Sequence, residues 1–183
     1  MRIKSHTGKI ILIVCLVLLS CGSAGKASYL SGKAWLAQIL LNRAWEQSQY
    51  SSQAIKPWPW ADIAPVAKLN IPSQQYEAIV LASHSGQAMA FGPGLIQRGG
   101  SYILAGHRDS HFNTLKDVGL GDEISLTLKS GEQKTATIQA ITVVDTNQQN
   151  EIIPPEKSIV LITCYPFDAI TVGGPLRYVI TAY

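Results

Sequence analysis

Three residues that could carry out acyl-transfer chemistry stand at the ends of apolar segments. Cys164 follows the apolar run 158–163, His107 follows the run 101–105 after one glycine, and Arg177 opens the last apolar run. A cysteine thiolate attacks carbonyl carbons near neutral pH, a histidine exchanges protons with reacting groups, and an arginine offers a fixed charge with planar donors. Each residue has a structural alternative when taken alone, but their joint placement indicates nucleophilic catalysis with Cys164 as the nucleophile.

The N-terminal segment, residues 1–26, has the pattern of an export signal or membrane anchor. Three basic residues precede an apolar run at 10–19, and small residues follow at 20–25. This order is typical of secretory signals, and the positive charge keeps the start of the chain cytoplasmic. We favour an uncleaved anchor; a lipoprotein acylated at Cys21 and a cleaved signal stay open. All three place the remainder of the chain outside the cytoplasm.

Export gives the cysteine count a meaning. Cys15 and Cys21 lie in the N-terminal segment, so Cys164 is the only thiol of the exported part. A lone cysteine in an oxidising compartment has no disulfide partner within its own fold. The alternative is a buried apolar cysteine, which the cysteine count alone does not exclude.

Charge and ligand patterns exclude several functions. The formal net charge is +3, but four of the 15 basic residues lie in the first 26 positions, where no acidic residue occurs, which leaves 11 basic against 12 acidic residues. The remainder therefore lacks the basic surface of a nucleic-acid-binding protein. One cysteine and three separated histidines lack zinc-ligand spacing, and no phosphate-binding fingerprint is present. We expect no metal and no cofactor.

The elements that must position the three residues are mostly strands. Residues 34–50 show the periodicity of an amphipathic helix, which would pack on the domain or lie on the membrane surface. The Pro/Trp stretch 56–60 completes a connector, 27–60, before a domain at 61–183. In that domain, short apolar segments between turn formers predict an all-β sandwich or barrel, with helical turns at 89–95 and 111–115. The predicted strands are 67–71, 76–81, 101–105, 123–128, 135–144, 158–163 and 176–182.

From about residue 64 to the end, the sequence resembles the sortases. Their hallmark is a strand ending in Thr-Leu-x-Thr-Cys, with a histidine upstream and an arginine downstream. Here it falls on Val160-Leu161-Ile162-Thr163-Cys164, on His107 within Ala-Gly-His-Arg, and on Arg177. Val160 replaces the first threonine, at a position that we expect to point away from the chemistry. The N-terminal segment and the helix with Ala-Trp-Leu-Ala-Gln also look like a short Gram-negative branch of the family.

The resemblance implies a closed sortase-type barrel of about eight strands with the three residues in one groove. Cys164 would attack a Thr–Gly-type peptide bond in the C-terminal sorting signal of an exported cargo protein. His107 would act as acid and base, and Arg177 would hold substrate carbonyls and the oxyanion. An amine acceptor, from a cell-envelope component or a protein, would resolve the thioester at the periplasmic face of a single-pass membrane protein.

Three neighbouring residues are weaker candidates for substrate binding. The hydroxyl of Thr163 would help to hold substrate, although a threonine at a strand end is as often structural. Asp109 and His111 follow His107 closely and would line the same groove, with turn positions as the alternative.

Three other functions are compatible with parts of the sequence. An L,D-transpeptidase is also an exported β-rich cysteine enzyme, but its signature keeps Ser, Gly, Cys and Arg within a few residues, whereas Arg177 lies 13 positions beyond Cys164. A non-enzymatic β-barrel binding module would bury Cys164 as an inert thiol. A hydrolase would release the cleaved peptide to water rather than to an amine.

Overall fold

The computed structural model describes residues 3–83, 85–148, 151–171 and 173–183. The chain forms two compact units, Met1–Ile39 and Leu40–Tyr183. A single helix, α1 (Ile3–Ser48), supplies the described part of the first unit and the start of the second. We expected a membrane anchor in residues 1–26. Among the described residues, however, no helix combines the length and the apolar character that a membrane crossing requires.

The end of α1 packs within the second unit, as one of the two predictions for the helix at 34–50 required. Leu41, Ala44, Trp45 and Ser48 are buried, and their spacing places them on one helical face. Trp58 of the Pro/Trp stretch meets Phe91 edge to face, with ring centroids 5.3 Å apart. The part of the chain from Leu40 onward belongs to the second unit. Leu41 and Trp45 form one apolar cluster with Ala61, Ile63, Ile79, Leu81 and Ala88.

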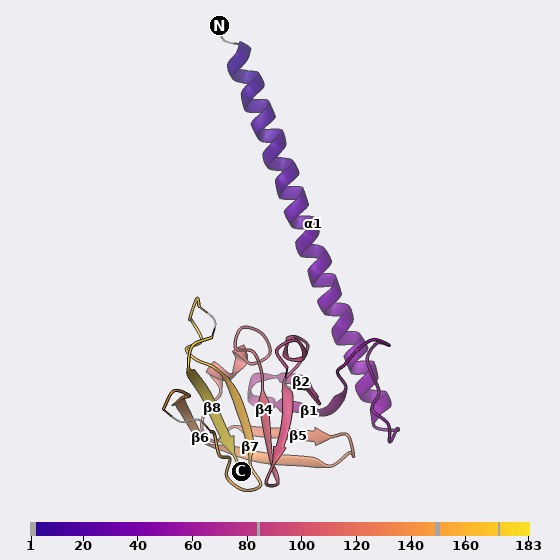
Figure 1. Cartoon of the computed structure of the whole chain (residues 1–183), viewed down its shortest axis with the longest axis vertical. Coiled ribbons are helices and arrows are strands. Elements are labelled where there is room, and N and C mark those ends of the chain that lie inside the picture. The colour runs from indigo at the N-terminus through magenta and orange to yellow at the C-terminus, as the bar shows by residue number, and fades with distance from the viewer. Residues whose placement is uncertain (1–2, 84, 149–150, 172) are drawn as a thin grey trace. The chain divides into compact units, whose positions relative to one another are not determined.

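Eight strands close into a barrel in the order β1-β2-β3-β4-β7-β8-β6-β5. Their bounds are β1 Pro65–Ile71, β2 Tyr76–Leu81, β3 Gly94–Arg98, β4 Ser101–Ala105, β5 Glu123–Leu128, β6 Gln133–Asp145, β7 Ile159–Cys164 and β8 Leu176–Ala182. Most pairs are antiparallel, but β2 pairs with β3 and β4 pairs with β7 in parallel. In Figure 1, β6, β8, β7 and β4 follow one another across one side of the barrel. The expected closed barrel of about eight strands is confirmed.

All seven segments predicted as strands are strands, whereas β3 is the strand that the sequence pattern missed. We expected a helical turn at 89–95. A short 3₁₀ helix, η2, does occupy Ala88–Ala90, but the chain is extended again from Gly94. Most of β3 is exposed, so its sequence lacks a buried apolar face. The turn before β4 contains Gly99 and Gly100 at φ values of 57° and 80°, which glycine adopts readily in tight hairpins. Two further 3₁₀ helices are η1 (Pro72–Gln74) and η3 (Asn113–Asp117); η3 overlaps the helical turn expected at 111–115.

The strand alternation corrects our expectation for Val160. Residues 159 and 161 of β7 point into the main core, while Val160 and Ile162 belong to an apolar cluster on the other face. Because side chains two and four residues apart share a face, Val160 lies on the face of Cys164. Val160 is only 1% exposed, and Ile152 of the β6–β7 loop packs against its cluster. Val160 therefore contributes to an apolar cluster on the face of β7 that also carries Cys164.

Candidate active site

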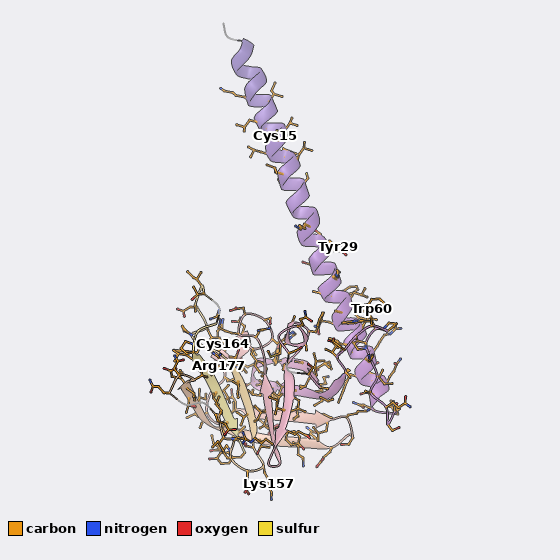
Figure 2. The ribbon with its side chains drawn as sticks, in the orientation of Figure 1. Cys15, Tyr29, Trp60, Lys157, Cys164 and Arg177 are labelled. Atoms are coloured by element: carbon orange, nitrogen blue, oxygen red, sulfur yellow. The ribbon has the colours of Figure 1, made fainter. Side chains whose placement is uncertain are left out.

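Cys164 and Arg177 are brought together by the pairing of β7 with β8. The two strands are antiparallel neighbours, and Cys164 lies directly opposite Arg177 in the register. Opposed residues of such a pair project from the same face with Cβ atoms about 4.5–5.5 Å apart. Figure 2 shows both residues at one end of the barrel, with Lys157, just before β7, at the opposite end. The thiol is half-buried, so it is accessible to a substrate.

His107 is held beside this pair by the parallel pairing of β4 with β7. Ala105 lies opposite Ile162, and the Gly106 amide donates to the Ile162 carbonyl at 3.2 Å. The buried Thr163 donates its hydroxyl proton to the Gly106 carbonyl at 2.8 Å. Two hydrogen bonds of Gly106, one from its amide and one to its carbonyl, thus join the end of β4 before His107 to the end of β7 that carries Cys164.

Gly106 permits close packing directly before His107. A Cβ at this position would lie 2.8 Å from Cδ2 and 3.0 Å from Cγ of Phe112, a ring with no exposed surface. The Phe112 amide also donates to the His107 carbonyl at 3.0 Å, which closes the turn after the histidine. A side chain at 106 would therefore push against the turn that carries the catalytic candidate.

We expect Gly106→Ala to destabilise the fold by about 1–3 kcal/mol, because overpacking a tight core forces backbone and side-chain shifts. Chemical denaturation measures this loss. Gly119→Ala is the matched control, since a Cβ there meets nothing within 4 Å. Equal stability of the two variants would show that Phe112 yields without cost.

His107 and Cys164 line one pocket of about 340 Å³. Asp109, a predicted substrate-binding residue, also lines this pocket. The remaining wall comes from Arg108, from Leu176 and from the β7–β8 loop, the segment between Cys164 and Leu176. The residues of this loop that line the pocket are Tyr165, Pro166, Ala169, Thr171, Gly173, Gly174 and Pro175. The described pocket lining does not include Thr163, His111 or Arg177, so a direct role of these three in substrate binding stays a prediction.

The side-chain nitrogens of His107 and Arg177 contact backbone carbonyl oxygens. Nε2 of His107 lies 3.3 Å from the Gly86 carbonyl, and Nη1 of Arg177 donates to the carbonyls of Gly174 at 2.6 Å and Leu176 at 2.9 Å. His107 is exposed and Arg177 is half-buried. Both side chains therefore have room to turn toward a substrate, and catalytic hydrogen bonds commonly tighten only when substrate is bound.

Asp109 is engaged by Arg108, a residue that the sequence analysis did not select. Nε and Nη2 of Arg108 donate to the two Asp109 carboxylate oxygens at 2.6 and 3.1 Å. Hydrogen bonding to Arg108 lowers the pKa of the Asp109 carboxyl, and the nearby His107 lowers it further. Asp109 is therefore ionised at neutral pH, and its substrate-binding role stays a prediction.

His111 differs from His107 in its surroundings. Burial lowers the pKa of His111, and the neighbouring His107 lowers it further, against a hydrogen bond with the Ala90 carbonyl at 3.4 Å. His111 is therefore neutral at pH 7. Within the described part of the chain, we find no group of three or more His, Cys, Asp or Glu side chains placed to hold a metal ion.

Comparison with known proteins identifies relatives of one kind. A family model described as a sortase domain matches residues 69–183, more than half of the chain. Sortase D of Bacillus subtilis (strain 168) is 36% identical over 83 residues, which cover 44% of this chain and 41% of that protein. The match thus spans less than half the length of this curated relative.

Solved structures share the fold at low sequence identity. A sortase D5 transpeptidase of Clostridium perfringens has a TM-score of 0.59 at 18% identity, covering 80% of this chain and 96% of the other. Sortase A from Corynebacterium diphtheriae has a TM-score of 0.55 at 24% identity, covering 68% of this chain and 62% of the other. The second of these chains therefore extends well beyond the matched region.

Proposed function

This chain belongs to the sortase family of cysteine transpeptidases, and we propose that it cleaves a sorting signal through a thioester and transfers the acyl group to an amine. The observation that carries the proposal is the placement of Cys164, opposite Arg177 in the β7–β8 register and in one pocket with His107. The family membership weighs against an L,D-transpeptidase. The finer parts of the proposal rest on the chemistry of these residues.

The first step forms the acyl-enzyme. The Cys164 thiolate attacks the carbonyl carbon of the scissile peptide bond, and the carbon–nitrogen bond then breaks to leave a thioester on Sγ. His107, as imidazolium, gives its proton to the departing amine. Arg177 exchanges the Gly174 and Leu176 carbonyls for the carbonyl oxygen of the substrate, whose negative charge develops during attack.

The second step releases the product. The incoming amine attacks the thioester carbon while neutral His107 accepts its proton. The carbon–sulfur bond breaks, Cys164 is regenerated, and a new amide joins the two molecules. The substrate is an exported protein with a C-terminal sorting signal, and the acceptor is an amine of the cell envelope or of another protein.

The N-terminal pattern supports a location outside the cytoplasm. Basic residues before the apolar run at 10–19 favour export of the domain that carries Cys164. We place the enzyme at the extracytoplasmic face of the inner or plasma membrane, in the short Gram-negative-type branch of the family. Fractionation of cells that express the full chain tests the location.

Intact-mass spectrometry with a library of candidate sorting peptides tests the activity. We expect a covalent peptide adduct that is discharged by hydroxylamine, and a new peptide bond when a glycine peptide is added. Discharge to water alone, with no amine incorporated, would identify a hydrolase. Absence of an adduct across the library, together with a native Cys164 that resists iodoacetamide, would favour a binding barrel.

A further inference from the structure

Arg108 is a buried cation whose donors are nearly all in use. Its side chain is 5% exposed, whereas that of its ion-pair partner Asp109 is 63% exposed. Four donor contacts use its three nitrogens, and a guanidinium has five N–H groups in all. A buried charge is costly unless it is paired and hydrogen-bonded. The pairing and hydrogen bonds of Arg108 meet both conditions, so its side chain can connect two segments of the fold.

Two of these contacts reach the loop that follows the nucleophile. Nη1 donates to the Pro166 carbonyl at 2.6 Å, and Nη2 donates to the Ala169 carbonyl at 2.9 Å. Pro166 and Ala169 lie two and five residues beyond Cys164, and both line the pocket. Because Arg108 directly follows His107, one guanidinium spans from the turn of the acid/base candidate to the loop of the nucleophile.

The geometry requires an arginine. The planar guanidinium donates to the Asp109 carboxylate through Nε and Nη2. Its Nη1 donates to the Pro166 carbonyl, and Nη2 also donates to the Ala169 carbonyl. A lysine keeps the positive charge but offers one ammonium centre on a flexible stem, so it cannot hold these acceptors together. The hydrogen bond to Asp109 raises the pKa of Arg108 against the opposing effect of burial, and the charges of Asp109, Cys164 and Asp168 raise it further. Arg108 therefore stays charged throughout the working pH range.

We propose that Arg108 is a positioning residue, which fixes the β7–β8 loop against the His107 turn and so sets the alignment of the pocket around Cys164. The proposal rests on the transpeptidase function for its kinetic consequence. Its structural consequence, an ordered loop, does not depend on that function.

The variant Arg108→Lys in the full chain tests the kinetic consequence and the structural consequence separately. We expect kcat for a sorting peptide to fall by roughly 10- to 100-fold, because a misplacement of about 1 Å in a catalytic site has effects of that size. KM should change less than about threefold, since most Arg108 donors are already engaged within the protein. Arg43→Lys is the matched control, because Arg43 is exposed on α1 and lies outside the pocket lining.

Hydrogen exchange measured by mass spectrometry gives a readout without substrate. In Arg108→Lys, amides of the segment 165–171 should exchange at least about tenfold faster, while peptides from β1, β2 and β5 keep their protection. Unchanged exchange in 165–171, or faster exchange throughout the barrel, would overturn the positioning role. So would a kcat within threefold of the parent when the parent is active. If the parent turns over no peptide, the proposed function fails, and the exchange data still decide whether Arg108 orders the loop.

Discussion

Replacing Cys164 with alanine is expected to abolish adduct formation with sorting peptides while leaving the barrel folded. The substitution removes only Sγ from a half-buried position at the end of β7. No other group in the described pocket lining combines the nucleophilicity and the placement needed to attack a peptide carbonyl. Loss of a catalytic nucleophile lowers kcat on the order of 10⁶-fold in a well-studied protease, so turnover should fall below detection.

The measurement needs a background in which Cys164 is the only thiol. Cys15 and Cys21 are exposed on α1 and would react with iodoacetamide or disulfide reagents. The variant Cys15→Ala/Cys21→Ala removes both, serves as the matched control, and should retain full adduct formation in vitro. Cys164→Ala in this background should show neither adduct nor labelling, with an unchanged unfolding midpoint. An adduct that persists in Cys164→Ala would place the nucleophile elsewhere and overturn the mechanism.

The location of the three catalytic candidates followed from local sequence, because Cys164 and His107 stand where an apolar strand ends and Arg177 stands where the last one begins. Strands such as 159–164 and 101–105 have strong apolar patterns, and their ends carry polar residues that a core does not need. What the pattern could not supply was the pairing partner of each strand. The parallel contact of β4 with β7, which sets His107 next to the nucleophile, joins segments more than 50 residues apart.

Features that depend on tertiary burial could not be predicted from the sequence. Arg108 was visible in Ala-Gly-His-Arg, but an arginine in a polar stretch predicts a solvated side chain, and only the fold places it at 5% exposure. Strand β3 escaped because its exposed positions carry no apolar period. The orientation of Val160 was the opposite case, because counting residues along β7 gives the face directly.

His107→Gln is expected to lower kcat/KM for peptide substrates by roughly 10²- to 10⁴-fold, the usual contribution of a positioned acid or base. Glutamine keeps a donor that can reach the Gly86 carbonyl, now 3.3 Å from Nε2, but it cannot exchange protons near neutral pH. Because His107 is exposed, stability should change by less than about 0.5 kcal/mol.

A change of leaving group isolates the acid role of His107. A depsipeptide, with an ester in place of the scissile amide, releases an alcohol that needs less help from a proton donor than an amine does. The acylation defect of His107→Gln should therefore be at least tenfold smaller on the ester than on the amide. His111→Gln provides the comparison: its ring is outside the described pocket lining and held near Ala90, so we expect a smaller loss on the amide with no leaving-group dependence. Equal defects of His107→Gln on both substrates would mean that the residue acts by shaping the pocket, and the proton donor would have to be sought elsewhere in the pocket.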